Sequence, residues 1–205
     1  AVSLRNDDEL HLYAADVNER FTIRIVVKHT LASSEYNTRR KECNTAVAWI
    51  QQHQPSVQAL RDVSVEQLNK FVLPKDPLIY NRARFVVEEI ERLMAACECL
   101  YEGNIDSLGK LMYSTHRGLS ELYQVSCKEL DWLVENVKNN PNVVGARMMG
   151  GGFGGCTINL VVASAIEPML EKLKPAYEAA MKLPLSYDVV SIEAGARLVL
   201  TAHNN

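Results

Sequence analysis

The sequence lacks long apolar runs and paired cysteines of the metal-binding kind. Crossing a bilayer takes about 20 consecutive apolar residues, and no stretch approaches that length, so we expect no membrane partner. The five cysteines are scattered and form no Cys-x-x-Cys pair, which argues against a zinc site or a disulfide framework. This use of cysteine favours reduced thiols in a cytoplasmic protein.

An excess of positive charge is missing as well. The formal net charge is −3, whereas nucleic-acid-binding surfaces usually carry a basic stripe that neutralises phosphates. The nearest candidate is the short cluster at residues 39–41, so we expect no nucleic-acid partner. What is present is an ordinary globular balance of 47% hydrophobic and 23% charged residues over 205 positions, enough for one large domain.

Helix and strand patterns divide the chain. Capping residues followed by apolar residues at helical spacing predict helix starts at Ser33 or Ser34, Ser64 with Gln67, Asp76 with Pro77, Ser126 with Glu129, and Ser164 with Glu167. The longest helix is expected to end at Gly103. Alternating or continuous apolar residues predict a hairpin within residues 2–14 and strands at residues 21–27, 143–149, 156–162, 189–190 and 198–200. The class is α+β, with helices packed on a mostly antiparallel sheet.

A glycine run between two predicted strands is the most unusual feature: Gly150, Gly151, Gly152, Phe153, Gly154 and Gly155. A Walker A loop needs Gly-Lys-Ser/Thr, but Cys156 and Thr157 follow here. A dinucleotide-binding loop needs a helix directly after the glycines, and the following residues read as a strand. Glycines also allow positive φ and close backbone approach. A tight hairpin is therefore the plain interpretation, with at least one positive φ in the run.

Residues 145–156 nevertheless resemble a known signature. Their Gly-Ala-Arg-Met lead and Phe-Gly-Gly-Cys core are similar to the third motif of the GHMP kinases, in its galactokinase form. Two more segments, residues 27–40 and 114–131, are similar to galactokinase segments in the same order. The resemblance covers most of residues 26–205. It implies a C-terminal GHMP-kinase domain at 26–205, built on a four-stranded, mostly antiparallel sheet, and a strand remnant of the N-terminal domain at 1–25.

The resemblance also implies a reaction. Galactokinases transfer the γ-phosphoryl group of ATP to the C1 hydroxyl of α-D-galactose, with Mg²⁺. Their N-terminal sugar signature, their Gly-Leu-Ser-Ser-Ser phosphate loop and their base aspartate do not occur in these residues. We therefore expect a composite chain, with a truncated start and an internal gap, that is inactive alone. A galactokinase-like regulator without catalysis, or a kinase for a related sugar such as N-acetylgalactosamine, stays open.

Individual residues take their expected roles from the same resemblance. Tyr36 is implied to contact the sugar, against the alternative that its ring packs in the core. The run Gly150–Gly155 is implied to back the phosphate loop. No catalytic or metal-binding residue is assigned, and ATP and Mg²⁺ are expected to bind mainly elsewhere. The other polar candidates have plainer expected roles: Arg39 and Arg40 as solvated charges or carboxylate partners, His29 and His116 as hydrogen-bonded structural groups, Glu35 as non-catalytic, and Cys127 and Cys156 as small buried hydrophobes.

Overall fold

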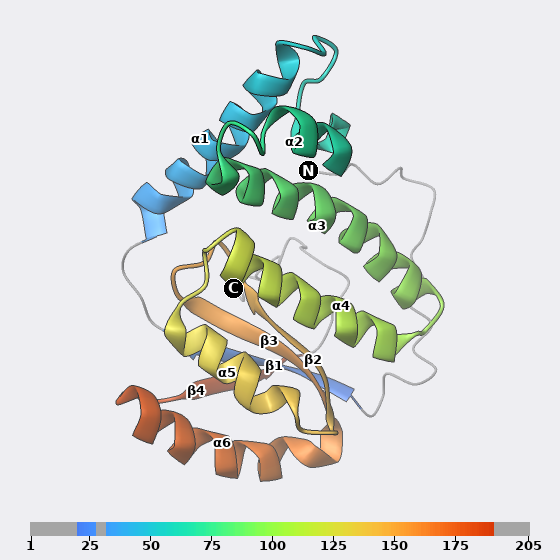
Figure 1. The fold of residues 1–205 in the computed structure, drawn as a ribbon. Coiled ribbons are helices and arrows are strands. Elements are labelled where there is room, and N and C mark those ends of the chain that lie inside the picture. Colours follow the sequence, from blue (N-terminus) through green and yellow to red (C-terminus); the bar gives the residue numbers. More distant parts are fainter. Residues whose placement is uncertain (1–19, 28–31, 191–205) are drawn as a thin grey trace, which may run out of the picture.

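A computed structural model describes residues 20–27 and 32–190 of the chain (Figure 1). The helices are α1 (Ala32–Gln51), α2 (Val65–Phe71), α3 (Pro77–Tyr101), α4 (Ile105–Arg117), α5 (Lys128–Lys138) and α6 (Ile166–Met181), with short turns at Leu60–Asp62, Gly118–Leu122 and Ala163–Ala165. The strands are β1 (Arg20–Val27), β2 (Val143–Met149), β3 (Gly155–Val162) and β4 (Ser186–Val190). The strands predicted within 2–14 and at 198–200 lie outside the described residues. Within those ranges no helix is long and apolar enough to span a membrane.

The strands form one antiparallel sheet in the order β2-β3-β1-β4. β2 and β3 are consecutive and are joined by the glycine run, whereas β1 comes from the start of the described chain and lies between β3 and β4. Figure 1 shows α1, α2 and α3 in the upper half, the sheet with α5 and α6 in the lower half, and α4 between them. The predicted α+β class, with helices packed on an antiparallel sheet, is confirmed.

The predicted division at residue 25 falls inside β1. This strand pairs along its whole length with β3, from Arg20 opposite Val162 to Val27 opposite Gly155. The described part of the first segment therefore belongs to the same sheet as the C-terminal strands. The assignment of residues 1–19 to another domain stays a prediction, because those residues lie outside the described ranges.

Two of the predicted helix starts have the expected geometry. The Ser64 side chain accepts from the Gln67 backbone N–H, and the Gln67 side chain accepts from the Ser64 backbone N–H. Asp76 caps α3 through the N–H groups of residues 78 and 79, with Pro77 in the first turn. Gly103 follows the end of α3 with φ +69°. These signals were readable because each is a local contact between residues close in sequence.

Three other predicted starts were wrong. Helix α1 already begins at Ala32, one residue before the first expected cap. Helix α5 has Cys127 as its N-cap with no side-chain bond, because the Ser126 hydroxyl donates instead to Asp131 Oδ1 at 2.5 Å. Ser164 lies inside a 3₁₀ turn, so the N-cap of α6 is Ala165, one residue later than expected. In the last two cases a competing local structure replaced the capping box.

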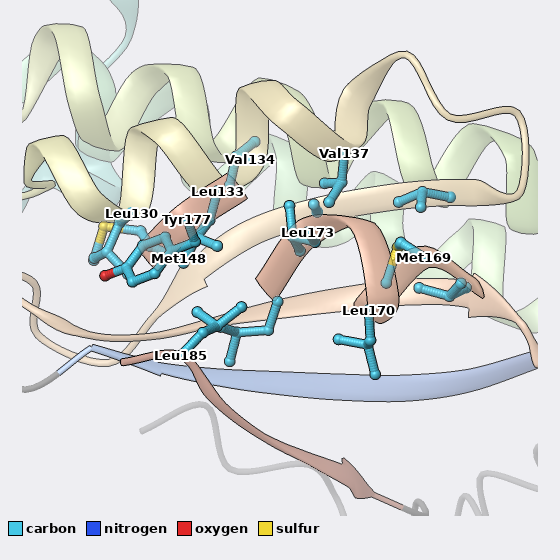
Figure 2. Close-up of a cluster of buried hydrophobic side chains, with 14 of the residues drawn as sticks. Leu130, Leu133, Val134, Val137, Met148, Met169, Leu170, Leu173, Tyr177 and Leu185 are labelled. Atoms are coloured by element: carbon cyan, nitrogen blue, oxygen red, sulfur yellow. The ribbon is translucent and has the colours of Figure 1, made fainter. Parts of the chain in front are cut away.

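Two hydrophobic clusters stabilise the two halves. One lies between the sheet and helices α5 and α6, as Figure 2 shows for Leu130, Leu133, Met148, Leu173 and Tyr177. The other joins α1, α2 and α3 and includes Ala46, Ile50, Leu68, Val72, Ala83 and Val87. Full burial of one such large aliphatic side chain contributes about 1.5–3 kcal/mol. Each half thus has a core of its own, and residues 118–127, between α4 and α5, lie where the halves meet.

Helix α4 rests directly on β2 through two glycines. A Cβ at Gly109 would lie 2.0 Å from the Val144 carbonyl oxygen, and one at Gly145 would lie 2.6 Å from the Gly109 Cα. Only a residue without a side chain allows this approach of helix backbone to strand backbone. The contact fixes α4, and with it the start of residues 118–127, against the strand that leads into the glycine run.

Candidate functional site

The glycine run forms a loop with a left-handed backbone over most of its length. Gly150, Gly152, Gly154 and Gly155 have φ between +91° and +125°, and Phe153 has φ +58°. The prediction of positive φ is confirmed. A non-glycine residue in this region carries strain of about 1–3 kcal/mol. Phe153 therefore needs support from its surroundings, and the next contacts supply it.

One side of the loop lies on Val125. The Phe153 N–H donates to the Val125 carbonyl oxygen at 2.5 Å. A Cβ at Gly152 would lie 2.3 Å from that oxygen, whereas a Cβ at Gly150 or Gly151 would meet no atom of the described residues within 4 Å. The expected close approach thus occurs at Gly152, and the backbone it meets is the turn before α5. The first two glycines are not covered by any residue that the structure describes.

Two buried arginines, one from α1 and one from α3, hold that turn. Arg39 on α1 donates from Nε to the Tyr123 carbonyl oxygen at 2.8 Å and from Nη2 to the Gln124 carbonyl oxygen at 3.2 Å. Arg82 on α3 donates to the Leu122 carbonyl oxygen and to Gln124 Oε1. Gln124 itself has φ +52°. Because the charged donors of Arg39 and Arg82 hold this turn, Gln124 can keep its left-handed backbone conformation.

Glu42 on α1 lies between the two guanidinium groups. Its Oε2 is 3.2 Å from Arg39 Nη1 and 3.3 Å from Arg82 Nε. Burial, together with the neighbouring Arg39, lowers the pKa of Arg82, and Glu42 opposes this shift. A carboxylate shared in this way offsets part of the cost of placing two positive charges in a buried position.

Tyr36 lies near the start of the same helix, three residues before Arg39. Its side chain is 58% exposed, so the alternative that it packs in the core is wrong. Burial raises the pKa of the Tyr123 hydroxyl, Cys43 adds to the shift, and Tyr36 makes a smaller contribution. The Arg39 guanidinium in turn lies 5.9 Å from the centre of the Phe153 ring. Arg39 thus links the helix of Tyr36 to the glycine loop.

His116 forms a separate network on the other side of residues 118–127. Its Nδ1 accepts the Met148 N–H at 3.1 Å, which leaves the proton on Nε2 to be donated to Asp131 Oδ1 at 3.2 Å. Asp131 also accepts from the hydroxyls of Ser120 and Ser126. Burial by itself raises the pKa of Asp131, but the bonds from His116 and the serines lower it below its usual value. Both nitrogens of His116 are occupied, as expected of a structural histidine.

This network lines a cleft of about 360 Å³ between α4 and α5. Tyr36 and the glycine loop do not contribute to its walls, which include Tyr113, His116, Ser120, Asp131, Glu135 and Lys138. Since both of its nitrogens are bonded, His116 offers this cleft no free imidazole for acid–base chemistry. The glycine loop with its neighbours on α1 is therefore the better candidate site.

The remaining polar candidates divide between the two networks and the surface. Arg40 is exposed, as expected. Arg39 is only 8% exposed, so it is not a solvated charge; it follows the other alternative and pairs with a carboxylate, that of Glu42. Glu35 lies 3.8 Å from Arg39. Cys127 and Cys156 are half-buried rather than buried, and burial raises the pKa of Cys127 to about 11. His29 lies outside the described residues.

Sequence reasoning missed Arg82 altogether, although a signal was present. Arg82 follows Ile79 by three residues and so lies on the apolar stripe of α3. Arg39 precedes Cys43, Ala46 and Ile50 at helical spacing in the same way. A lone charge on an apolar stripe indicates a buried ion pair, and both arginines have one.

The fold and the loop together define the class of protein. Residues 94–179 match the family described as GHMP kinases C terminal, and this part of the chain is a GHMP kinase C-terminal domain. Within that class, the chain is similar to galactokinases. It is 38% identical over 184 residues to the galactokinase of Thermotoga neapolitana, covering 88% of this chain and 50% of the relative. It is 42% identical over 156 residues to the galactokinase of Roseiflexus sp. (strain RS-1), covering 75% and 39%.

A solved structure supports the same likeness. The galactokinase of Lactococcus lactis, crystallised in complex with galactose, matches with a TM-score of 0.78 and 30% identity, over 85% of this chain and 45% of that one. The resemblance read from residues 27–40, 114–131 and 145–156 is thereby confirmed. The chain spans about half the length of the curated relatives it matches.

Proposed function

We propose that the protein containing this chain is a galactokinase. It transfers the γ-phosphoryl group of ATP to the C1 hydroxyl of α-D-galactose, and Mg²⁺ assists by neutralising phosphate charge. The observation that carries the proposal is the likeness, in fold and sequence, to a galactokinase whose structure holds galactose. A cytoplasmic location, favoured by the scattered thiols, is part of the same proposal.

Phosphoryl transfer depends mainly on positioning and charge neutralisation, with little covalent chemistry left to the protein. In this proposal Tyr36 contacts the sugar through its exposed, amphipathic ring. The loop Gly150–Gly155 backs the phosphate-binding segment with its open side, where Gly150 and Gly151 leave room for another backbone. Both roles suit the arrangement in which Arg39 connects the two elements.

The metal and the nucleotide are assigned to other residues of the whole protein. Across 20–27 and 32–190, no group of three or more His, Cys, Asp or Glu side chains could hold a metal ion. Mg²⁺ would supply neutralisation of the β- and γ-phosphates. In this proposal the described residues contribute the shape of the pocket.

An assay of ADP release tests the proposal. The full-length protein, with its mass verified, is given ATP and Mg²⁺ with galactose, N-acetylgalactosamine or no sugar. Galactose-dependent turnover supports the proposal, and turnover only with N-acetylgalactosamine assigns the alternative substrate. Galactose binding without turnover from either sugar would instead support the regulator. The 205-residue chain alone is expected to give no turnover, and activity from that verified chain would contradict the expectation.

A further inference from the structure

Arg39 makes several contacts with the candidate site that an arginine with a merely solvated charge would not make. Its guanidinium donates to two successive carbonyl oxygens, those of Tyr123 and Gln124, and lies over the ring of Phe153. Its own helix carries Tyr36 one turn earlier. One side chain therefore contacts the turn that seats the glycine loop, contacts the loop itself, and belongs to the helix of the proposed sugar contact.

The burial of Arg39 shows that these contacts are specific. A guanidinium that is 8% exposed is stable only when its donors are paired. Arg39 directs two of them at backbone carbonyls separated from it by 84 and 85 residues, and it shares Glu42 with Arg82. A rigid planar fork can serve two carbonyls and a carboxylate together, which a lysine ammonium on a flexible stem cannot do with the same geometry.

The turn transmits the position of Arg39 to the loop. Val125 follows the two carbonyls directly and accepts the Phe153 N–H, while Gly152 lies against Val125 itself. A displacement of residues 123–125 would therefore displace Phe153 and Gly152. At the other end, a shift of α1 would carry Tyr36 with it.

We propose that Arg39 is a positioning residue, which fixes the spacing between Tyr36 on α1 and the glycine loop. Its consequence for catalysis rests on the proposed galactokinase function. Arg82 supports the same turn from α3, but it is not on the helix of Tyr36. Arg39 contacts both the turn and the loop from the helix of Tyr36, so its loss should loosen the connection between the two elements while the reacting groups stay in place.

Two variants in the full-length protein test this: Arg39→Lys, which keeps the charge, and Arg39→Met, which removes it. The matched control is Arg84→Met, since Arg84 is a half-exposed arginine of α3 whose ion pair is with Glu88, across one helical turn. Melting temperature checks the fold of each variant. Hydrogen–deuterium exchange of the peptide covering 150–156 then reports the loop, and kcat and KM for galactose and ATP report the site.

We expect faster exchange at 150–156 in both Arg39 variants and no change in Arg84→Met. A misplacement of about 1 Å can lower a rate about 100-fold, so kcat should fall about 10- to 100-fold in Arg39→Lys, more than either KM rises. In a double-mutant cycle with Phe153→Leu, the combined loss in kcat should be smaller than the product of the single losses.

Unchanged loop exchange in a folded Arg39 variant would overturn the proposal, and so would faster exchange with an unchanged kcat. If Arg39→Met does not fold, Arg39→Lys decides on the same terms. A wild-type protein without galactose-dependent turnover would refute the galactokinase function, and the exchange experiment would still decide whether Arg39 positions the loop.

Discussion

The glycine loop has a packed side and an open side, and they differ although they are one residue apart. At Gly152 an added Cβ would meet the backbone and side chain of Val125, whereas at Gly151 it would meet no atom within 4 Å among residues 20–27 and 32–190. The packed side continues through residues 122–125 to Arg39, Arg82 and Glu42. The open side is the part of the loop that no described residue covers. The difference separates the glycines that the fold needs from those that a bound group could use.

The largest effect is expected at the packed side, with Gly152→Ala. The left-handed φ of +91° costs about 1–3 kcal/mol for a side-chain-bearing residue, and the contact at 2.3 Å with Val125 adds an overpacking cost of about 1–3 kcal/mol. Denaturant unfolding should show the loss. A stability within 0.5 kcal/mol of the wild type, on the order of an ordinary surface change, would contradict the packed side.

The second-largest loss of stability is expected for Asp131→Asn, because the Asp131 carboxylate supports the packed side. Hydrogen bonds to a charged group are worth about 1.5–3 kcal/mol, and a half-exposed carboxylate belongs near the low end. Because the pKa of Asp131 is lowered in the fold, its contribution is complete above the ordinary aspartate value of about 3.9 and is lost as pH falls below it.

The measurement is the difference in unfolding free energy between the wild type and Asp131→Asn from pH 6 to pH 3. We expect this difference to be constant near pH 6 and to shrink towards pH 3. A difference that stays the same over the whole range would mean that the ionised carboxylate is not what stabilises the turn.

On α1, away from the packed side, Tyr36→Phe should change ligand affinity and leave stability alone. Loss of one neutral hydrogen bond to the sugar is worth about 0.5–1.5 kcal/mol, or roughly a 2- to 12-fold rise in galactose KM, with ATP KM little changed. Tyr36→Ala should raise it further, because the ring contact is lost too. The matched control is Tyr101→Phe at the end of α3, where the tyrosine is 88% exposed. If Tyr36→Phe leaves the galactose KM unchanged, Tyr36 does not form the proposed hydrogen bond to the sugar.

The smallest effect is expected at Gly151→Ala. With open space around the new methyl group and no positive φ at this residue, stability should stay within about 0.5 kcal/mol of the wild type. A change in ATP or galactose KM without a change in melting temperature would show that the open side is used by a ligand. If Gly151→Ala destabilises the protein as much as Gly152→Ala does, the proposed difference between the two sides of the loop is wrong.

Local signals in the sequence were enough for the fold class, the glycine run and the best helix caps. Asp76 with Pro77 and Ser64 with Gln67 act within three residues, so the chain itself displays them. The same local rules failed at Ser126, whose hydroxyl bonds to Asp131 instead of capping α5. Two local contacts competed there, and the geometry of the folded turn decided between them.

Local sequence rules could not predict how the residues of the candidate site come together. That the loop rests on Val125, or that Arg39 reaches Tyr123, depends on segments far apart in sequence, and pairing between a side chain and backbone carbonyls leaves no periodic pattern. The positions of Arg39 and Arg82 on apolar stripes could have indicated their burial, though not their partners. Tyr36 was found by family resemblance, and its exposure agrees with a role outside the core.

The place of β1 in the sheet has a consequence for biosynthesis. β1 leaves the ribosome first among the described strands, yet its partners are β3 and β4, with Arg20 opposite Val162 and Thr22 opposite Val190. At about 5–20 residues per second, these partners arrive many seconds later. Helices α1, α2 and α3 form a core of their own and can fold in that interval. We therefore expect β1 to wait unpaired beside a finished helical half until synthesis of the described chain is nearly complete.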